Sequence, residues 1–327
     1  MIKKLNKIGV LTSGGDAPGM NAAIRAVVRT AVYNHLEVIG IKSGYDGLIR
    51  NEFIKLKNYS VSDIIQKGGT IIKSARCEEF KTAEGMQQAY SNLKNEGIDS
   101  IVVIGGDGTF SGANEFDRIY DFPIVGLPGT IDNDLFGTDF TIGYDTALNT
   151  VVEAIDKIRD TAYSHNRLFF IEVMGRDAGF IALRSGIAGG AEDILIPETK
   201  THIEDLIHKL EYDWRHNKKS GIVIVAEGDD AGGAYEIARR VNEKFTNYKT
   251  RVTILGHVQR GGSPSCMDRV LASTLGYESV KALINGKRSV MVGQVNKKIA
   301  FTPFAEAIKH HQKIDENMLE MARILAL

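Results

Sequence analysis

Short runs rich in valine and isoleucine alternate with segments of helical period along this chain, and this alternation constrains the fold more than any other feature. The strand-like runs lie at 7–12, 37–41, 100–106, 122–127, 167–174, 193–197, 221–228 and 251–256. Apolar residues at three- and four-residue spacing lie between them, at 20–33, 82–95, 144–165, 177–187, 202–216 and 233–247. Continuously apolar strands joined by helices predict a mostly parallel, doubly wound α/β sheet with both faces covered.

The chain length of 327 residues suits two domains or one large α/β unit. The six prolines form no linker, and no repeat or low-complexity segment interrupts the chain. The pattern changes near Gly143, where a long helical segment begins, so we expect a domain edge there. A second domain would be joined by short crossings.

Charge and composition exclude several classes of partner. The 40 Lys and Arg residues balance 41 Asp and Glu residues, so no basic field favours nucleic acid or an anionic membrane. No apolar run is long enough for a signal peptide or a membrane span. The two cysteines, Cys77 and Cys266, form no zinc pattern. We expect reduced thiols in a cytoplasmic protein, with a disulfide between them as the alternative.

Glycine gathers where three of the strand-like runs end. The three stretches are TSGGDAPG at 12–19, GGDGT at 105–109 and PGTIDND at 128–134. Glycine lets backbone N–H groups approach an anion, and a following helix N-terminus adds partial positive charge. Any one of these stretches is equally explained as a tight turn, with Asp16 or Asn21 as a helix cap or an Asx turn in DND. Three at the ends of one sheet favour a phosphate site.

The common phosphate motifs are missing, since the chain contains neither GxxxxGK[ST] nor GxGxxG. Four acids accompany the glycines instead: Asp16, Asp107, Asp132 and Asp134. Carboxylates repel phosphates unless a cation such as Mg²⁺ lies between them. A carboxylate can also accept the proton of an attacking hydroxyl. The combination predicts phosphoryl transfer.

Two further motifs follow, MGR at 174–176 and GHVQRGGSP at 256–264. With TSGGDAPGMNAAIR, GGDGT and PGTIDND, they stand in the order and spacing of the bacterial-type, ATP-dependent 6-phosphofructokinase family, which the chain resembles from Ile8 to its last helical segment. The resemblance implies two doubly wound, three-layer α/β/α domains with mostly parallel sheets and an active site in the cleft between them. The larger, ATP-binding domain would span 1–142 plus about 258–308. The smaller domain, which binds fructose 6-phosphate, would span about 143–257 plus 309–327.

The resemblance assigns chemistry to single residues of the first half. Asp132 matches the general base for the 1-hydroxyl of fructose 6-phosphate, and Asp107 matches the Mg²⁺ ligand, with Asp134 reaching the ion through water. Arg76 would reach the transferring phosphoryl group. The implied catalytic set is Asp132, Arg76, Arg176, Thr130 and Gly15. The implied ATP-binding set is Gly15, Tyr45, Arg76, Cys77, Gly106, Asp107, Gly108 and Thr109.

The sugar site is implied mainly by the second half of the chain. Its residues would be Thr130, Ile131, Asp132, Arg167, Met174, Gly175, Arg176, Glu227, Arg251, His257, Val258, Gln259 and Arg260. Of these, His257 and Arg260 would lie near the 6-phosphate. Arg167 and Arg251 match arginines that come from a neighbouring subunit, so the resemblance implies a homotetramer. For Asp16, a cap and a contact to magnesium-bound water both remain, and we expect the cap.

Two glycines bear on the phosphoryl donor. The family has ATP-using and pyrophosphate-using branches, and the latter tend to carry Asp and Lys where this chain has Gly108 and Gly129. An Asp side chain would obstruct the nucleotide's α-phosphate region. We therefore expect ATP, with the pyrophosphate-dependent enzyme as the alternative.

A second anion site is implied between subunits, with ADP as activator and phosphoenolpyruvate as inhibitor. Its residues would be Arg25, Arg29, Asn58, Tyr59, Ser60, Asp63, Arg159, Gly190, Ala191, Glu192, His216, Lys218, Lys219 and Ser220. Asn58 and His216 stand where family members often carry Arg and Lys, so weaker effector binding is expected. His216 would also make the response depend on pH.

Two rival functions share part of this pattern. A non-catalytic nucleotide sensor would have lost the base or the Mg²⁺ acid, yet Asp132 and Asp107 are both present. NAD and lipid kinases share GGDGT, but PGTIDND and GHVQRGGSP argue against them.

Overall fold

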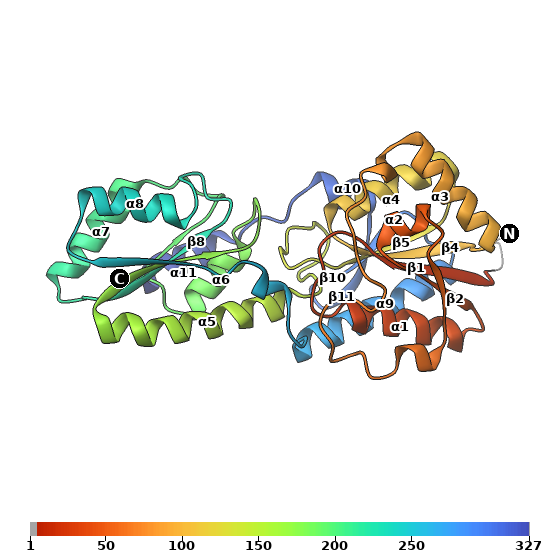
Figure 1. Cartoon of the computed structure of the whole chain (residues 1–327), viewed down its shortest axis with the longest axis horizontal. Helices are drawn as coiled ribbons and strands as arrows, with labels where there is room; N and C mark the ends of the chain where they lie inside the picture. Colours follow the sequence, from red (N-terminus) through yellow and green to blue (C-terminus); the bar gives the residue numbers. More distant parts are fainter. Residues whose placement is uncertain (1–4, 327) are drawn as a thin grey trace. The chain divides into compact units, whose positions relative to one another are not determined.

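The computed structural model describes residues 5–326 and divides into two compact units. The first holds the chain through Ile131 together with Leu135–Thr146 and Arg260–Gln312. The second holds Asp132–Asp134, Ala147–Gln259 and the chain from Lys313 onward. Both are α/β with mostly parallel sheets, so the predicted fold class is confirmed (Figure 1).

A seven-stranded sheet of order β11-β10-β5-β4-β1-β2-β3 forms the centre of the first unit. Its strands are β1 (Lys7–Thr12), β2 (Glu37–Ile41), β3 (Phe53–Leu56), β4 (Ser100–Gly105), β5 (Ile124–Pro128), β10 (Val290–Val295) and β11 (Lys298–Pro303). The five central strands run parallel, while β3 and β11 add antiparallel edges. After β2 and the edge strand β3, the chain returns to the other side of β1 as β4, so the strand order reverses between β1 and β4.

Helices cover both faces of this sheet. They are α1 (Met20–Tyr33), α2 (Gly44–Ile49), α3 (Ala83–Glu96), α4 (Asp107–Tyr120), α9 (Cys266–Ile284) and α10 (Phe304–Lys309). Figure 1 shows α1 and α9 side by side on one face and α3, α4 and α10 on the other. Short 3₁₀ turns occur at Asn58–Val61 and Glu79–Lys81. The core on the second face includes Phe110, Phe116 and Phe304.

The second unit contains a smaller, fully parallel sheet of order β7-β8-β6-β9. Its strands are β6 (Arg167–Val173), β7 (Asp193–Leu195), β8 (Gly221–Ala226) and β9 (Lys249–Ile254). Its helices are α5 (Tyr144–His165), which begins in the first unit, α6 (Phe180–Ala188), α7 (Ile203–Arg215), α8 (Ala234–Lys244) and α11 (Glu316–Leu325). The apolar faces of α7 and α8 pack on β6 and β8, while α5 and α6 lie across the sheet from them (Figure 1).

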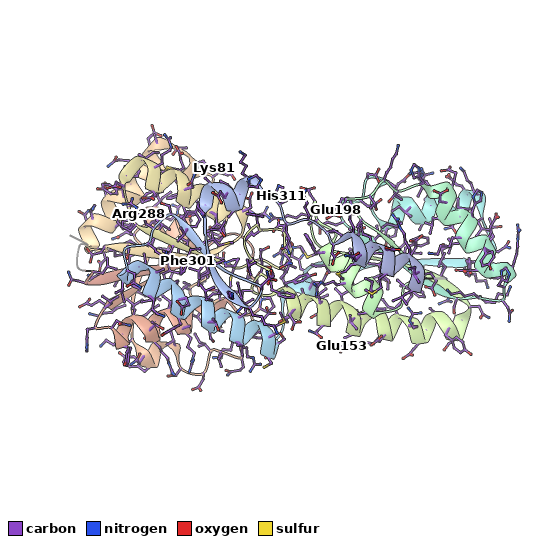
Figure 2. All side chains as sticks on the ribbon, turned by 180° about the vertical axis from the view of Figure 1, so that it is seen from behind. Lys81, Glu153, Glu198, Arg288, Phe301 and His311 are labelled. Carbon is purple, nitrogen blue, oxygen red and sulfur yellow. The ribbon has the colours of Figure 1, made fainter. Side chains whose placement is uncertain are left out.

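The hairpin of β10 and β11 was not predicted from the sequence. Its turn consists of Asn296 and Lys297, both with left-handed backbone (φ 49° and 63°). Such a two-residue turn matches the twist of antiparallel strands, but glycine usually takes the second position. Figure 2 shows Phe301 on β11 and Arg288 just before β10.

Within residues 5–326, no helix is long and apolar enough to cross a membrane.

Candidate active site

The three glycine-rich stretches lie together at one edge of the first sheet. They follow β1, β4 and β5, which are adjacent and parallel, so their carboxyl ends meet. Ser13 N–H donates to the Ile104 carbonyl at 3.0 Å, and Gly129 N–H donates to the Gly105 carbonyl at 2.9 Å. This edge lies where the strand order reverses, the position at which open α/β sheets bind ligands.

The first stretch is bonded to the segment that carries Arg76. Gly14 N–H donates to the Ala75 carbonyl at 3.3 Å, and the Ser74 hydroxyl donates to the Gly14 carbonyl at 2.7 Å. Arg76 itself is exposed, and within residues 5–326 its guanidinium has no carboxylate at ion-pair distance. The structure therefore holds an uncompensated cation beside the glycine loop, as a phosphate site requires.

Asp16 does not cap the helix that follows it. The N-cap of α1 is Gly19, with φ 111° and no side-chain hydrogen bond, so the expected cap is wrong. Asn21, the other candidate cap, points elsewhere: its amide donates to the carbonyls of Lys67 and Gly68 and accepts from Ile71 N–H. Asn21 thus holds the 67–71 loop against α1.

Arg260 lies over the first glycine loop. Its Nη1 donates to the Asp16 carbonyl at 3.3 Å, and a Cβ atom at Gly15 would lie only 2.7 Å from the same Nη1. The sequence indicated the sugar 6-phosphate for Arg260, whereas its guanidinium here contacts the predicted nucleotide loop. Gly15 permits this approach because it has no side chain.

The second stretch forms the start of α4. Gly106 is the N-cap, and Asp107 and Gly108 are the first helical residues, whose N–H groups have no acceptor inside the helix. A Cβ atom at Gly108 would meet nothing within 4 Å. Because glycine costs about 1 kcal/mol inside a helix, and packing does not require it here, the open space is available to a ligand.

Thr109 connects the first two stretches. Its hydroxyl donates to the Ser13 carbonyl at 3.1 Å, and its N–H donates to the Gly106 carbonyl at 3.0 Å. Thr109 thus has a structural role at this junction, and its contact with ATP phosphates stays a prediction. The N–H groups of this stretch that have no acceptor inside the helix are those of Asp107 and Gly108.

Tyr45 supports the second stretch from the core. The ring is 5% exposed, stacks on Phe80 with centroids 3.9 Å apart, and donates its hydroxyl to the Thr109 carbonyl at 2.7 Å. Burial raises the pKa of this phenol. The resemblance implied that Tyr45 lines the nucleotide pocket. In the structure its ring is buried and its hydroxyl supports the backbone at Thr109. Cys77 packs against the same core, and burial raises the pKa of its thiol.

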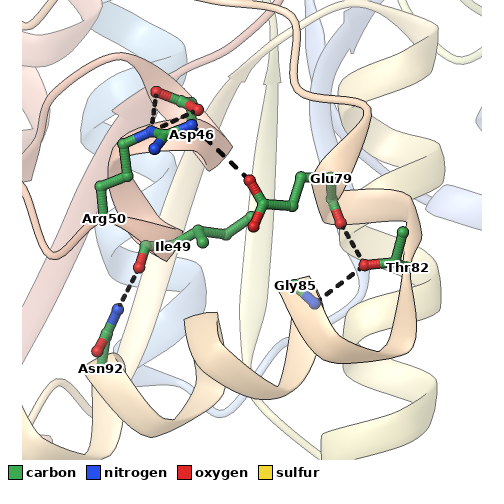
Figure 3. Close-up of polar contacts among 7 residues, drawn as sticks. All are labelled: Asp46, Ile49, Arg50, Glu79, Thr82, Gly85 and Asn92. Atoms are coloured by element: carbon green, nitrogen blue, oxygen red, sulfur yellow. Dashed lines mark hydrogen bonds and ion pairs between the residues drawn. The ribbon is translucent and has the colours of Figure 1, made fainter.

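Polar contacts fix α2, which carries Tyr45, against α3. Arg50 bonds Asp46 at 2.9 Å and lies 3.8 Å from Glu79. The Asn92 amide donates to the carbonyls of Leu48 and Ile49 at the end of α2, and Figure 3 shows the bond to Ile49. These contacts join α2 to α3 and to the turn at Glu79–Lys81.

The third stretch carries Asp132, which is 2% exposed. Oδ2 of Asp132 lies 3.6 Å from Nε of Arg176, the last residue of MGR. The Thr141 hydroxyl donates to the Thr130 carbonyl at 2.6 Å, which fixes the loop before the acid. The Ile131 side chain is fully buried, and its place in the sugar site stays a prediction.

The donor set is compatible with a magnesium ion that arrives with phosphates. Within the described residues, no group of three His, Cys, Asp or Glu side chains could hold a metal alone. Mg²⁺ in phosphate-transfer sites takes one or two carboxylates, and substrate phosphates and water complete its shell. Asp107, at the first turn of α4 beside the open space at Gly108, fits that requirement.

The motifs of the second unit meet at the carboxyl ends of β6, β8 and β9. Glu227 N–H bonds the Val173 carbonyl at 3.0 Å, and Leu255 N–H bonds the Glu172 carbonyl at 3.1 Å. The MGR turn has left-handed backbone at Gly175 (φ 145°) and Arg176 (φ 51°). A Cβ atom at Gly228 would lie 2.0 Å from the Arg176 carbonyl oxygen, so the turn after Glu227 packs directly on MGR.

Gln259 is an anchor in this arrangement. It is fully buried, accepts a hydrogen bond from Met174 N–H at 3.2 Å and donates to the Gly256 carbonyl at 3.0 Å. Its amide therefore joins the MGR turn to the 256–260 turn, and the sugar contact through Gln259 stays a prediction. Its neighbours His257 and Val258 are exposed.

Arg167 and Arg251 lie away from this edge. Arg167 is the first residue of β6, and Arg251 pairs with Phe169 on the adjacent strand β9, so both arginines are on one face of the sheet. Six residues of strand, roughly 20 Å, separate Arg167 from Val173 at the carboxyl end. Neither side chain can reach the MGR turn of its own chain.

Part of the predicted effector set gathers in the second unit. Arg159 and Lys218 lie 3.8 Å and 3.7 Å from the buried carboxylate of Glu192, and Arg159 donates to the Gly190 carbonyl at 2.7 Å. The sequence missed Asp213, which lies 3.7 Å from Lys218. Asp213 lies in the last turn of α7 and belongs to no motif, so no sequence pattern indicated that it forms an ion pair with Lys218. Ala191, between Gly190 and Glu192, is buried.

Two predicted effector residues are committed to α7 instead. Lys219 donates to the Trp214 carbonyl at 2.8 Å, and its ammonium lies 3.9 Å from the centre of the Trp214 ring. The ring nitrogen of His216 bonds the Tyr212 carbonyl at 2.8 Å, and the two rings are 4.0 Å apart. Both bond carbonyls at the end of α7, so of the three basic residues at 216–219 Lys218 is the one beside Glu192, together with Arg159.

The first unit holds the other part of that set. Arg25 and Arg29 share a face of α1, and burial, with a smaller effect of the Arg29 charge, lowers the pKa of Arg25. Arg29 and Asn58 line one surface pocket together with Tyr33 and His35. Sequence reasoning missed His35, which follows the helix with φ 60°. Ser60 bonds Lys57 N–H within its own turn.

Comparisons with known proteins agree with this architecture. A family model described as phosphofructokinase matches residues 7–283. The ATP-dependent 6-phosphofructokinase 2 of Bacteroides thetaiotaomicron is 55% identical over 320 residues, 98% of each chain. The ATP-dependent 6-phosphofructokinase of Bacillus subtilis is 53% identical over 323 residues, 99% of this chain and all of that one.

Among solved structures, phosphofructokinase from Saccharomyces cerevisiae superposes with a TM-score of 0.89 at 37% identity. The match covers 98% of this chain and 48% of the yeast chain, so this chain spans about half the length of that one. With a family model that matches most of the sequence and relatives above 50% identity over nearly full length, the chain belongs to the phosphofructokinase family.

Proposed function

We propose that this chain transfers the γ-phosphoryl group of ATP to the 1-hydroxyl of fructose 6-phosphate, giving fructose 1,6-bisphosphate and ADP. The observation that carries the proposal is the pairing of buried Asp132 with Arg176, on a loop whose Gly129 N–H is hydrogen-bonded to the Gly105 carbonyl of the second glycine-rich stretch. Relatives at 53–55% identity are named ATP-dependent 6-phosphofructokinases, which is the same activity.

In this proposal Asp132 accepts the proton of the attacking hydroxyl. Its side chain is almost fully buried, so the carboxylate has little freedom and its distance to a bound hydroxyl is fixed. Arg176, beside the same carboxylate, would orient the sugar and offset the charge that develops on the transferring group. Such a base contributes typically about 10²–10⁴-fold to the rate.

The nucleotide phosphates would lie on the glycine loops. The N–H groups of Asp107 and Gly108 lie at the N-terminus of α4, where anions are favoured, and Gly15 lies in the adjacent first stretch. Arg76, held beside Gly14, supplies a cation to the phosphoryl group as its charge redistributes. Mg²⁺, when bound at Asp107, would neutralise phosphate charge.

The donor assignment rests mainly on Gly108. The structure leaves the space beside its Cα open, which supports a ligand reason for glycine there. Gly129 carries less information, because a Cβ atom there would lie 2.9 Å from Ile104 and 3.1 Å from Met20. Packing alone requires glycine at 129, whichever donor is used.

We also propose a cytoplasmic homotetramer in which Arg167 and Arg251 complete the sugar-phosphate site of a neighbouring subunit. Their position on the face of β6 and β9, far from MGR, supports this. ADP and phosphoenolpyruvate would act at a second site formed by Arg25 and Arg29 of one subunit and Arg159 and Lys218 of another.

A coupled assay with fructose 6-phosphate, run in parallel with Mg-ATP and Mg-pyrophosphate, tests the proposed reaction. Turnover with ATP and little with pyrophosphate supports it. Turnover with pyrophosphate alone would overturn the donor assignment, and no turnover with either donor would favour a nucleotide-binding sensor.

A further inference from the structure

The carboxylate of Asp268 is buried (1% exposed) in the third position of α9, yet it serves another helix. Oδ1 accepts Gly143 N–H at 2.8 Å, and Oδ2 accepts Thr146 N–H at 2.8 Å and the Thr146 hydroxyl at 2.6 Å. All three donors belong to the start of α5. An acid at this position usually bonds the N-cap of its own helix.

The starts of α5 and α9 cap each other. Ser265 is the N-cap of α9, and its N–H is the group that Asp268 would bond in an ordinary capping box. Here the Ser265 N–H donates to the Thr146 hydroxyl at 2.9 Å instead. The Ser265 hydroxyl accepts from Asp268 N–H at 3.1 Å and donates to Asp145 Oδ2 at 2.5 Å. Two carboxylates thus lie at two helix N-termini, where the helix dipoles stabilise negative charge. Burial raises the pKa of Asp268, and its hydrogen bonds to Thr146 and Gly143 oppose this.

The segment that Asp268 holds also supports the loop before the proposed base. The Thr141 hydroxyl donates to the Thr130 carbonyl at 2.6 Å, and Ile142 N–H donates to the Pro128 carbonyl at 2.8 Å. The next residue is Gly143, whose N–H is bonded to Asp268. Three consecutive residues therefore join the Asp268 carboxylate to the backbone of 128–130.

The same segment touches the first glycine stretch. A Cβ atom at Gly143 would lie 2.7 Å from Ala17 Cβ, and one at Gly19 would lie 2.7 Å from Ile142 and 3.6 Å from the Asp268 carbonyl. Both glycines have left-handed backbone, with φ 103° and 111°. Fixing a glycine costs more backbone entropy than fixing any other residue. The close contacts of Gly19 and Gly143 therefore need a hydrogen bond that holds the backbone in place, and the bond from Gly143 N–H to Asp268 supplies one.

We propose that Asp268 is a positioning residue: by clamping Gly143 and Thr146 it fixes the spacing between the nucleotide stretch at 17–19 and the loop at 128–131 that leads to Asp132. Its catalytic consequence rests on the proposed function, while the clamp itself does not. Asp268 touches neither substrate nor nucleotide in this account.

The test compares Asp268→Asn with Asp117→Asn. Asp117 is also a buried carboxylate of the first unit, but it binds Arg288 and Ser289 at the end of α4 away from the glycine stretches. The readouts are hydrogen exchange of peptides covering 13–20 and 128–146, and kcat and KM at a temperature where both variants are fully folded.

We expect Asp268→Asn to speed exchange in both peptides and to lower kcat by about tenfold to a hundredfold, with KM for each substrate changed much less. Asp117→Asn should lose stability but keep the exchange of these peptides and kcat. Unchanged exchange in folded Asp268→Asn would overturn the clamp, whether or not the chain has the proposed activity. Faster exchange with kcat within twofold of the wild type would overturn the positioning role.

If Asp268→Asn fails to fold, the same measurements are made on Thr146→Val. This change removes one donor to Asp268 and the acceptor of Ser265 N–H, while it keeps the side-chain volume nearly constant. Faster exchange at 128–146 with a smaller loss of kcat in the same direction supports the proposal. An unaltered exchange pattern in folded Thr146→Val would overturn it.

Discussion

The guanidinium of Arg176 lies beside the carboxylate of Asp132, with 3.6 Å between Nε and Oδ2, although one side chain is half-exposed and the other is buried. The left-handed backbone at Arg176 and the contact of Gly228 with its carbonyl oxygen hold this geometry. A fixed cation beside a buried acceptor is a site where a hydroxyl can be bound and deprotonated in one place.

Gly108→Asp should weaken ATP use without unfolding the chain. The space beside Gly108 is open, so the side chain fits, but its charge would face the nucleotide phosphates. Repulsion on the order of 1 kcal/mol or more at close range raises KM for ATP by about tenfold. Steady-state kinetics at varied Mg-ATP measures this.

Gly129→Ala is the matched control for that substitution. Its methyl group would press on Ile104 and Met20, so stability should fall by about 1–3 kcal/mol, as read from urea unfolding. An unchanged KM for ATP in Gly108→Asp would contradict the ligand reason for that glycine.

Arg167→Ala and Asp132→Asn should complement each other when mixed. If Arg167 serves a neighbour's site, a mixed oligomer contains some sites with both residues intact. Random assembly from equal amounts gives about a quarter of sites intact. Activity after co-refolding, compared with each variant refolded alone, measures this, and a mixture no more active than its components would argue for a site within one chain.

Lys218→Ala should weaken the effector response, while Lys219→Ala should not. Lys218 is directed at Glu192, whereas Lys219 lies on the Trp214 ring. Loss of one charged contact to an anion costs about tenfold in affinity. Titration of ADP and phosphoenolpyruvate against both variants measures the difference, and equal losses would refute this division of roles.

Asp229→Asn should gain stability relative to the wild type as the pH rises. Burial raises the pKa of Asp229, although hydrogen bonds from Thr201 and Ala231 N–H oppose this. A carboxyl with a raised folded pKa binds more protons when folded, so its contribution to stability is lost as pH rises from the unfolded value through the folded one. Asparagine does not titrate. Urea unfolding of both proteins at several pH values tests the sign, which a constant difference would contradict.

The sequence predicted the parallel strands and their glycine-rich ends because both are local signals. The runs at 7–12 and 37–41 match β1 and β2, and the segment at 144–165 matches α5. Apolar periodicity and glycine clusters need no knowledge of distant residues.

Helix α9 and the β10–β11 hairpin, which the sequence did not predict, lack such local signals. Helix α9 has buried residues such as Leu271 and Leu275 together with exposed apolar ones such as Val270 and Tyr277. Because its apolar residues lie all round, no amphipathic stripe marks it. The β10–β11 turn places a lysine where glycine is usual.

The roles of single site residues depend on partners far away in the chain. Thr109 bonds Ser13 across 96 positions, and Asp268 bonds Gly143 across 125. No pattern within a motif distinguishes a threonine that faces a phosphate from one that faces a neighbouring loop. The motifs therefore indicated the chemistry, while the division of labour among their residues required the structure.

The most direct test of the account is the kinetics of Asp132→Asn with Mg-ATP and fructose 6-phosphate. Asparagine keeps the size of the side chain but cannot accept the proton, so kcat should fall by about 10³-fold or more while both KM values stay within a few-fold. A kcat within tenfold of the wild type would show that Asp132 is not the base and would contradict the central claim.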